Sequence, residues 1–254
     1  MWVNETLVAV EASVDGIGVR WAGIEWQVDP LGGDAELRWL DEALTGQARA
    51  VLWCAPRGLV APLSYRRHAG FDAACAAFGA AGWPVRLRRS GGGVVPQGPG
   101  LLNLSLAYCP GGAPGHCADA VYAHLCATLV RALGWLGIEA HTRSVRGSFC
   151  DGRFNLAVLT NEGDRKIAGT AQYWRRDGER HAVLAHALLL LEADTELLTE
   201  KANAFEAALG SERRYDANAV TTIAHAWRAA HAGMAPPPDL AVQLRRYIAA
   251  ALAG

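Results

Sequence analysis

Arg88-Arg89-Ser90-Gly91-Gly92-Gly93-Val94-Val95 is the stretch around which the chain is organised, together with its later partner Lys166-Ile167-Ala168-Gly169-Thr170-Ala171-Gln172. The first reads as a strand that ends in three glycines, and the second places a lysine on the strand side of a small-residue turn. Glycines have no Cβ and let a backbone approach a ligand closely, and a lysine ammonium is a point charge suited to a phosphate or carboxyl oxygen. We therefore interpret the pair as a site that holds an activated acyl group. A hairpin or bulge would also explain the glycines, and a strand-edge charge would also explain Lys166.

The composition favours an ordered, reduced, cytoplasmic protein. The chain has 254 residues, of which 51% are hydrophobic and 19% charged, and its net charge is −1, so it can bury a sizeable core and lacks the basic balance of a nucleic-acid binder. No apolar run reaches the roughly 20 residues that a membrane span needs, and the first residues do not form a signal peptide. Six irregularly spaced cysteines suit a reducing compartment. We expect neither a nucleic-acid nor a membrane partner.

The scarcity of lysine draws attention to Lys166. Only two of the 24 basic residues are lysines, and the other, Lys201, sits in a polar, helical context. Arginine supplies most of the positive charge in this chain, yet its planar guanidinium cannot replace a compact ammonium. Lys166 lies in an apolar, strand-like run, which favours a specific role for its ammonium group.

The hydrophobic pattern predicts an α+β fold with mixed or antiparallel sheets flanked by helices. Predicted helices cover residues 34–44, where Asp34 would be the N-cap, and 71–81, 118–136, 195–208, 217–232 and 239–253. Predicted strands lie within 6–29 and at 50–54, 85–89, 101–106, 139–145, 154–159, 166–174 and 182–191. Pro96-Gln97-Gly98-Pro99-Gly100 and residues 160–164 and 175–180 are predicted turns. We expect a catalytic domain at 1–208 and a short C-terminal helical section at 209–254.

Cys150 is a candidate nucleophile because it lies in a Gly-Ser-Phe-Cys-Asp-Gly loop between two predicted strands. A thiolate placed there by a rigid scaffold can attack a carbonyl carbon, and the flanking Arg146 and Arg153 would favour the thiolate form. A structural loop cysteine is the alternative. No metal site is expected, because the spacing of the remaining Cys and His residues matches no zinc motif; these are Cys109, His116, Cys117, His124 and Cys126.

These motifs resemble a known family, the lipoate–protein ligases and octanoyl or lipoyl transferases, which share a fold with biotin protein ligases. The resemblance runs from about residue 35 to 205 and rests on residues 88–95, 102–105 and 166–172, with His186 on a later strand. It implies a biotin/lipoate protein ligase-like fold, in which a mixed sheet holds an acyl chain. The implied acceptor is a lysine of a lipoyl-carrier protein, and the acyl group is lipoate or octanoate, free or carrier-bound.

The resemblance also assigns roles to residues. Lys166 would hold the acyl carbonyl or a phosphate oxygen, and Cys150 would be the second catalytic candidate. The residues that would bind the acyl group or a nucleotide are Arg88, Ser90, Gly91, Gly92, Gly93, Val94, Val95, Asn103, Asn155, Gly169, Thr170, Ala171, Gln172 and His186.

The motifs match two branches of the family with different chemistry. Residues 148–152 resemble the nucleophile loop of octanoyl amidotransferases, which use a cysteine thioester and no cofactor. Gly93 resembles the third glycine of the ligases, which use ATP and Mg²⁺ to form lipoyl-adenylate, although Pro96-Gln97-Gly98 replaces their Tyr/Phe-His-Asp and Phe154-Asn155 replaces their Asn-Asp. The Ala-, Gly- and Arg-rich composition suggests a GC-rich genome, whereas the amidotransferases are associated chiefly with low-GC bacteria. On balance we expect ATP-dependent ligation, with transfer through Cys150 close behind and a non-catalytic acyl-binding protein third.

Overall fold

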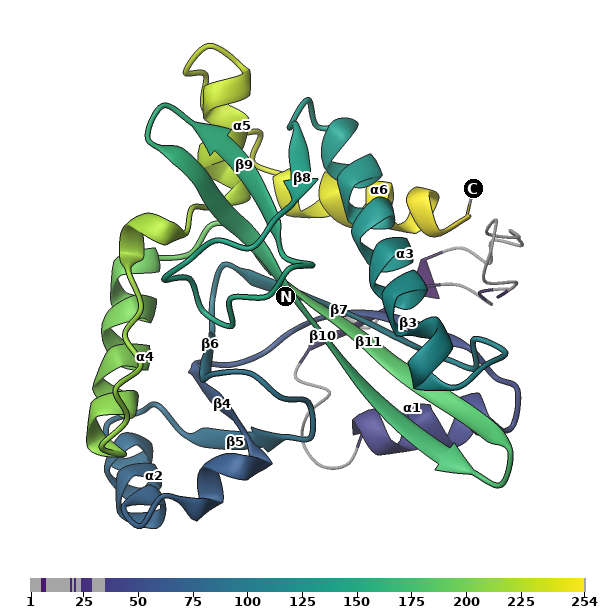
Figure 1. The fold of residues 1–254 in the computed structure, drawn as a ribbon. Coiled ribbons are helices and arrows are strands. Elements are labelled where there is room, and N and C mark those ends of the chain that lie inside the picture. The colour runs from purple at the N-terminus through teal and green to yellow at the C-terminus, as the bar shows by residue number, and fades with distance from the viewer. Residues whose placement is uncertain (1–5, 8–18, 20, 22–23, 29–34, 254) are drawn as a thin grey trace.

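The computed structural model of the protein describes residues 6–7, 19, 21, 24–28 and 35–253, and they form two sheets flanked by helices (Figure 1). The larger sheet contains, in spatial order, β1 (Thr6–Leu7), β2 (Ile24–Val28), β3 (Arg49–Cys54), β7 (Leu101–Tyr108), β11 (Arg180–Leu190), β10 (Gly163–Asp177), β9 (Leu156–Thr160) and β8 (Ala140–Thr142). The smaller sheet contains β5 (Val85–Arg88), β4 (Gly58–Pro62) and β6 (Val95–Gln97). The α-helices are α1 (Ala35–Leu44), α2 (Phe71–Ala80), α3 (Pro114–Gly134), α4 (Thr195–Ala208), α5 (Ile223–Ala230) and α6 (Leu240–Ala253), with 3₁₀ turns at Leu63–Arg67 and Ala217–Ala219.

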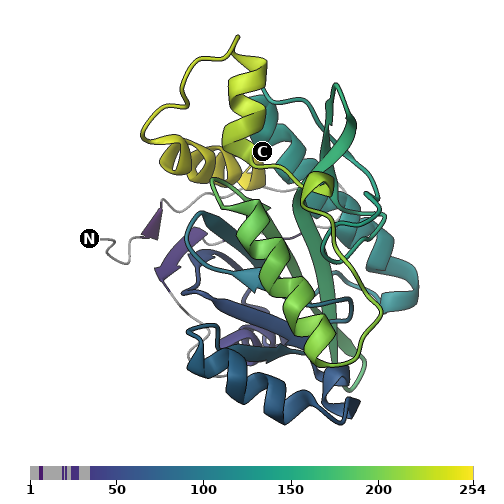
Figure 2. The same ribbon diagram turned by 90° about the vertical axis from the view of Figure 1, so that its left-hand side faces the viewer.

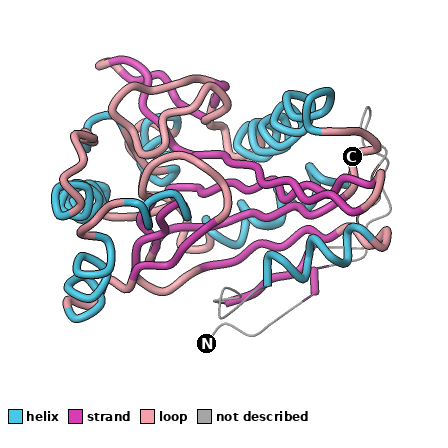
Figure 3. The backbone as a smooth tube through the Cα atoms, turned by 60° about the horizontal axis from the view of Figure 1, so that its bottom comes forward, coloured by secondary structure: helices cyan, strands magenta, loops and turns pink. Residues whose placement is uncertain are grey.

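The strand pairing confirms the predicted fold class. Strand β2 runs parallel to β3 and β4 runs parallel to β5, whereas the other paired strands are antiparallel, so both sheets are mixed. The predicted meander is present as β9, β10 and β11, which are adjacent and antiparallel. Figure 3 shows the strands in the middle of the molecule with the helices around them.

The central strand β7 separates the core from the side that carries the site. Because successive side chains of a strand point to opposite faces, Leu102, Leu104 and Leu106 join the core under α3 and α6. Asn103 and Ser105 therefore point to the other face, where α1 packs and where the smaller sheet lies with α2 and α4 (Figure 1). Figure 2 shows α4 crossing the front of the molecule, below α5 and α6.

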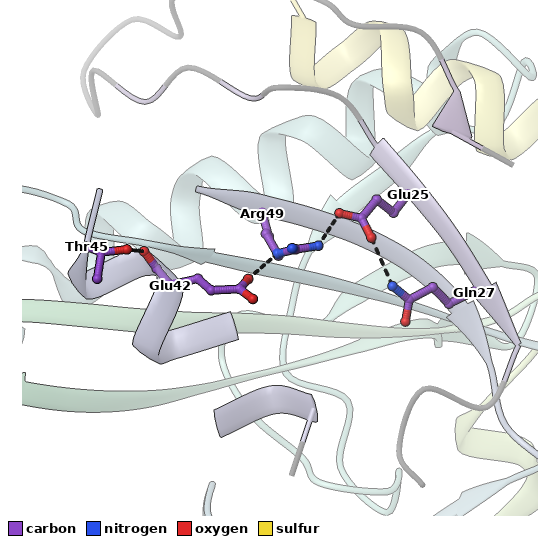
Figure 4. A network of polar contacts seen from close by, with 5 residues as sticks. All are labelled: Glu25, Gln27, Glu42, Thr45 and Arg49. Atoms are coloured by element: carbon purple, nitrogen blue, oxygen red, sulfur yellow. Dashed lines mark hydrogen bonds and ion pairs between the residues drawn. The ribbon is translucent and has the colours of Figure 1, made fainter. Parts of the chain in front are cut away.

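A polar network fastens α1 to the edge of the larger sheet (Figure 4). Arg49 on β3 forms ion pairs with Glu25 on β2 and with Glu42 on α1. Gln27 donates a hydrogen bond of 2.9 Å to Glu25, and the Thr45 hydroxyl donates to the Glu42 carbonyl at 2.7 Å. The Arg49, Glu25 and Glu42 side chains are about one-third exposed, so we expect the network to orient α1 more than to stabilise the fold.

One helix prediction is wrong. The segment 217–232 is not a single helix, because Val220 forms a β-bridge with Lys166 and the Thr221 amide donates to the Lys166 carbonyl at 2.9 Å. These contacts hold residues 220–221 in an extended conformation. Thr222 then starts α5 as an N-cap, since its side chain accepts a hydrogen bond from the His225 amide.

Four smaller differences concern the strands. Pro96 was expected in a turn but lies in β6, a short edge strand, where a missing amide hydrogen is tolerated. The turn expected at 175–180 shrinks to the two residues between β10 and β11, because both strands extend further, and β8 is shorter than the strand expected at 139–145. Strand β4 was not predicted. The expected Asp34 cap, and most of the strand expectation within 6–29, fall outside the described residues.

Candidate active site

Two neighbouring cavities lie on the face of the sheet that carries Asn103 and Ser105. The smaller, of about 70 Å³, has an apolar wall and is lined by Val95, Cys150, Lys166, Ala171, Leu188 and Leu190, among others. The larger, of about 400 Å³, is lined by Glu36, Trp53, Arg86, Arg89, Ser90 and Tyr173, among others. Val60, Arg88, Gln97 and His186 line both cavities and form the boundary between them.

Lys166 reaches the smaller cavity because β10 carries a β-bulge. The pairing of β10 with β9 shifts between Lys166 and Ala168, which leaves Ile167 as the extra residue. A bulge re-aims the side chains beside it. Ile167 and Ala168 both pack into the core under α3, whereas Lys166 lines the cavity on the opposite face. A Cβ on Gly169 would lie 2.9 Å from the Lys166 Nζ, so the absence of a side chain there makes room for the lysine.

The Lys166 ammonium holds the backbone of the loop that carries Cys150 (residues 143–155, the cysteine loop). Its Nζ donates to the Phe149 carbonyl and, at 3.3 Å, to the Cys150 carbonyl. Asn155 Nδ2 donates to the same Cys150 carbonyl at 2.9 Å, and Asn155 Oδ1 accepts from the Thr170 amide at 3.2 Å. Cys150 has a positive φ of 50°, which costs about 1–2 kcal/mol for a residue with a side chain. The hydrogen bonds to its carbonyl keep Cys150 in this conformation.

The segment after β5 (residues 89–94, the glycine loop) lies directly against the cysteine. A Cβ on Gly92 would lie 2.3 Å from the Cys150 Sγ, and Gly92 has a φ of 104°, so both space and conformation require glycine. Arg88 shapes this loop, because its guanidinium donates to the Gly91 carbonyl at 2.9 Å and to the Gly93 carbonyl at 2.6 Å. Arg88 thus acts on the backbone of the glycine loop while it also lines both cavities.

Polar side chains form the boundary between the cavities. Ser105 Oγ accepts a hydrogen bond from Trp53 Nε1 at 3.0 Å and lies 2.9 Å from His186 Nδ1. The Ser105 hydroxyl can donate to Nδ1, an assignment from the hydrogen-bond network that places the imidazole proton on Nε2. Gln97 and Asn103 exchange two side-chain hydrogen bonds, of 3.0 and 3.1 Å. Gln97 was not predicted as a binding residue. The sequence feature that could have identified it is the departure of Pro96-Gln97 from the ligase pattern.

Burial shifts the pKa of two side chains that line the smaller cavity, Lys166 and His186. Loss of solvent lowers the pKa of Lys166 to about 8, against a smaller opposing effect of Cys150 and Asp151. Loss of solvent, reinforced by Arg88, lowers the pKa of His186 to about 4. His186 is therefore neutral at pH 7, and Lys166 titrates close to physiological pH.

The structure brings most of the predicted residues to this region in different roles. Ser90, Val95, Gly169, Thr170, Ala171, Gln172 and His186 line one or both cavities, as do Arg88, Cys150 and Lys166. The side-chain hydrogen bonds of Thr170 and Gln172, however, go to the Phe154 and Ala118 carbonyls. Val94 is a core residue, Gly91 is exposed, Asn103 lies behind Gln97, and Asn155 holds the Cys150 backbone.

Within the described ranges, no three His, Cys, Asp or Glu side chains are grouped so that they could hold a metal ion. No helix in the described part of the chain is long and apolar enough to cross a membrane.

Comparison with known proteins gives a consistent result. The family described as "Lipoyl protein ligase A/B catalytic domain" matches residues 69–228. An uncharacterized protein of Cupriavidus necator is 53% identical over 206 residues, which cover 78% of this chain and 81% of that protein. An octanoyl-[GcvH]:protein N-octanoyltransferase of Kyrpidia tusciae is 38% identical over 148 residues, or 56% of this chain, and the match spans only 49% of that enzyme.

A solved structure shows the same fold. The bi-partite lipoate protein ligase of Thermoplasma acidophilum, described with its E2 lipoyl domain, matches with a TM-score of 0.53. The match covers 94% of this chain and 92% of that chain at 17% identity, so the likeness concerns the fold alone.

Proposed function

Because this chain belongs to the lipoyl protein ligase A/B catalytic-domain family, whose members are acyl-transferring enzymes, we propose that it moves an octanoyl or lipoyl group onto a lysine of a lipoyl-carrier protein through a thioester on Cys150. The observation that carries this proposal is the position of Cys150. Its sulfur faces Gly92, and the residue lines an apolar cavity together with the Lys166 ammonium. The 38% identical octanoyltransferase supports the same choice.

The arrangement accounts for the first half of the reaction. The Cys150 thiol gives up its proton and its sulfur attacks the acyl carbonyl carbon of the donor as the thiolate; the C–N or C–S bond to the donor breaks, and the leaving group takes up the proton that the thiol released. A lysine ammonium has three N–H groups, and the Phe149 and Cys150 carbonyls accept from Lys166. A remaining N–H is free to stabilise the oxyanion that forms on the acyl oxygen.

The second half regenerates the enzyme. The neutral amine of the acceptor lysine attacks the thioester carbon, the C–S bond breaks, and the amine proton returns to the Cys150 sulfur. An amide on the carrier forms, and no oxidant or reductant is consumed. The apolar wall of the smaller cavity suits the first carbons of a medium-length acyl chain.

ATP-dependent ligation is the second candidate, and the larger cavity favours it. Arg88, Arg89 and Ser90 line that cavity and could supply donors to the phosphate of an acyl-adenylate. In that route ATP and Mg²⁺ would activate free lipoate or octanoate, and Cys150 would take no covalent part.

The two routes are separated by intact mass spectrometry of the enzyme. The wild type is incubated with an octanoylated carrier without ATP, and separately with free octanoate and ATP. We expect an octanoyl adduct on wild type and on Cys75→Ser, a control at another partly buried free cysteine, but not on Cys150→Ser. Carrier modification that needs ATP and survives in Cys150→Ser would reject the thioester route in favour of ligation.

A further inference from the structure

Tyr215 lies between the glycine loop and the cysteine loop, and neither of the proposed steps uses it. A Cβ on Gly93 would lie 2.2 Å from the Tyr215 hydroxyl oxygen, so this hydroxyl packs on the Gly93 backbone. On its other side, the Tyr215 ring lies 5.4 Å, centroid to centroid, from the ring of Phe149, which directly precedes Cys150. Tyr215 therefore contacts both segments that flank the Cys150 sulfur.

Helix α4 holds Tyr215 in this place. Asn203 donates to the Tyr215 carbonyl at 2.9 Å and accepts from its amide at 2.8 Å, so the backbone is fixed at both polar groups. The Tyr215 hydroxyl donates at 2.8 Å to Oε1 of Glu206, a fully buried carboxylate. Tyr65 donates to the same oxygen at 2.6 Å. A buried carboxylate needs such donors, so the hydroxyl of Tyr215 has one preferred position.

The same segment also contacts the other two parts of the site. The Asp216 amide donates to the Gly147 carbonyl of the cysteine loop at 2.8 Å, and the Thr221 amide donates to the Lys166 carbonyl at 2.9 Å. Residues 215–221 thus contact, in order, the glycine loop, the cysteine loop and strand β10, which carries Lys166.

We propose that Tyr215 is a positioning residue: its hydroxyl packs on Gly93, so that a displacement at this contact moves the glycine loop against the Cys150 sulfur and slows the acylation of Cys150. Gly92 directly precedes Gly93 and packs on the Cys150 sulfur. A displacement of Gly93 therefore also moves Gly92 relative to this sulfur. This inference rests on the proposed thioester function. It adds a residue outside both cavity linings to the determinants of the reaction.

The test is a double-mutant cycle on the contact between Gly93 and Tyr215. Gly93→Ala would bring a methyl group against the hydroxyl, and a displacement of about 1 Å at a reacting group can cost 100-fold in rate. Tyr215→Phe removes the oxygen. The added methyl would then lie 3.4 Å from the ring carbon Cζ, an ordinary contact, and 3.0 Å from the end of the flexible Arg213 side chain, which has to move slightly. We expect Cys150 acylation to be about 100-fold slower in Gly93→Ala and to recover to within about 3-fold of wild type in the double variant.

Tyr65→Phe supplies the matched control, because it removes a hydroxyl that binds the same Glu206 oxygen. The atoms nearest to a Cβ at Gly93 belong to Tyr215 and Arg213, so Tyr65→Phe combined with Gly93→Ala should stay as slow as Gly93→Ala alone. Recovery in both double variants, or in neither, would overturn the positioning role. Recovery in one and not in the other shows that the effect of Gly93→Ala passes through its contact with Tyr215.

A second readout separates this inference from the proposed function. Alkylation of Cys150 by iodoacetamide reports the placement of the sulfur without any acyl transfer. If wild type forms no acyl adduct, the thioester function fails. The alkylation rates of the same variants still test the positioning role of Tyr215. A changed alkylation rate in Gly93→Ala that only Tyr215→Phe reverses supports that role. Equal alkylation rates in all variants would reject it.

Discussion

The ammonium of Lys166 lies 3.3 Å from the main-chain carbonyl oxygen of Cys150, 16 residues away in the sequence. One cation therefore serves two purposes. It fixes the backbone of the loop that carries Cys150, and in the proposed mechanism it would face the acyl oxygen as that oxygen develops negative charge.

The contribution of Lys166 to acylation should decrease as pH rises through about 8, because the buried lysine loses its proton there. The measurement is the rate of Cys150 acylation in wild type and Lys166→Ala, without acceptor, from pH 6 to 10. We expect a ratio of at least about 100 at pH 6, which shrinks at high pH. Use of the ratio cancels ionisation of the donor; a ratio that does not change with pH would contradict a role for the charge.

Lys166→Met should make the protein more stable while it abolishes activity. The pKa of Lys166 is about 8 in the folded protein and 10.5 in an ordinary environment. Between these values the unfolded chain binds more protons, so the stability of the wild type rises with pH in that window and carries a full penalty below it. A shift of this size corresponds to about 3 kcal/mol, which is the upper limit of the expected gain at pH 7.

Urea unfolding of Lys166→Met at pH 7 and pH 10.5 measures this effect. The difference from wild type should be largest at pH 7 and nearly absent at pH 10.5. Lys201→Met on α4 is the control, since Lys201 pairs with Glu200 at the surface. Equal gains in both variants would show that the burial of Lys166 is not the cause.

Gly169→Ala should damage the site without unfolding the protein. A methyl group there would lie 2.9 Å from Nζ and 3.0 Å from Cε of Lys166, and the buried side chain must move away from the Phe149 and Cys150 carbonyls. We expect a loss of about 10- to 100-fold in acylation rate. Gly79→Ala in α2 meets nothing within 4 Å and serves as the control, with unchanged activity.

His186 should weaken the fold in acid. Its pKa is about 4 in the folded protein and 6.5 in an ordinary environment, so the unfolded chain takes up a proton first as pH falls. The stability of the wild type should therefore fall from pH 6.5 to 4, by about 3 kcal/mol in total from this residue. His186→Gln removes this titration. Its free energy of unfolding, measured by urea titration, should therefore rise relative to that of wild type as the pH falls from 6.5 to 4. A difference between the two proteins that does not change with pH would contradict the burial of a neutral imidazole.

The sequence was sufficient to predict those elements that depend on residue type and on spacing over a few neighbouring residues. Helix α4 matches its prediction at both ends, and the three-strand meander was identified from its turns. The signals at Gly91–Gly93, Cys150 and Lys166 also identified the segments that meet at the cavity. Each of these depends on residue type and short-range spacing, which a sequence displays directly.

The remaining features depend on contacts between distant residues. The bulge at Ile167 decides which face receives Lys166, yet the apolar run around it is compatible with either face. The extended residues 220–221 look helical in isolation and become extended because Lys166 provides a strand partner. Gln97 and Tyr215 gained importance through Asn103 and Gly93, and no local pattern reveals such pairs.

The contact of Thr221 with Lys166 has a consequence for protein synthesis. The ribosome makes the glycine loop, the cysteine loop and the lysine strand before residues 215–221, which hold all three. A nascent chain that has released only its first 208 residues therefore contains both Cys150 and Lys166 but lacks the segment that fixes them. In the proposed mechanism, acyl transfer should therefore begin only after residues 215–221 have left the exit tunnel.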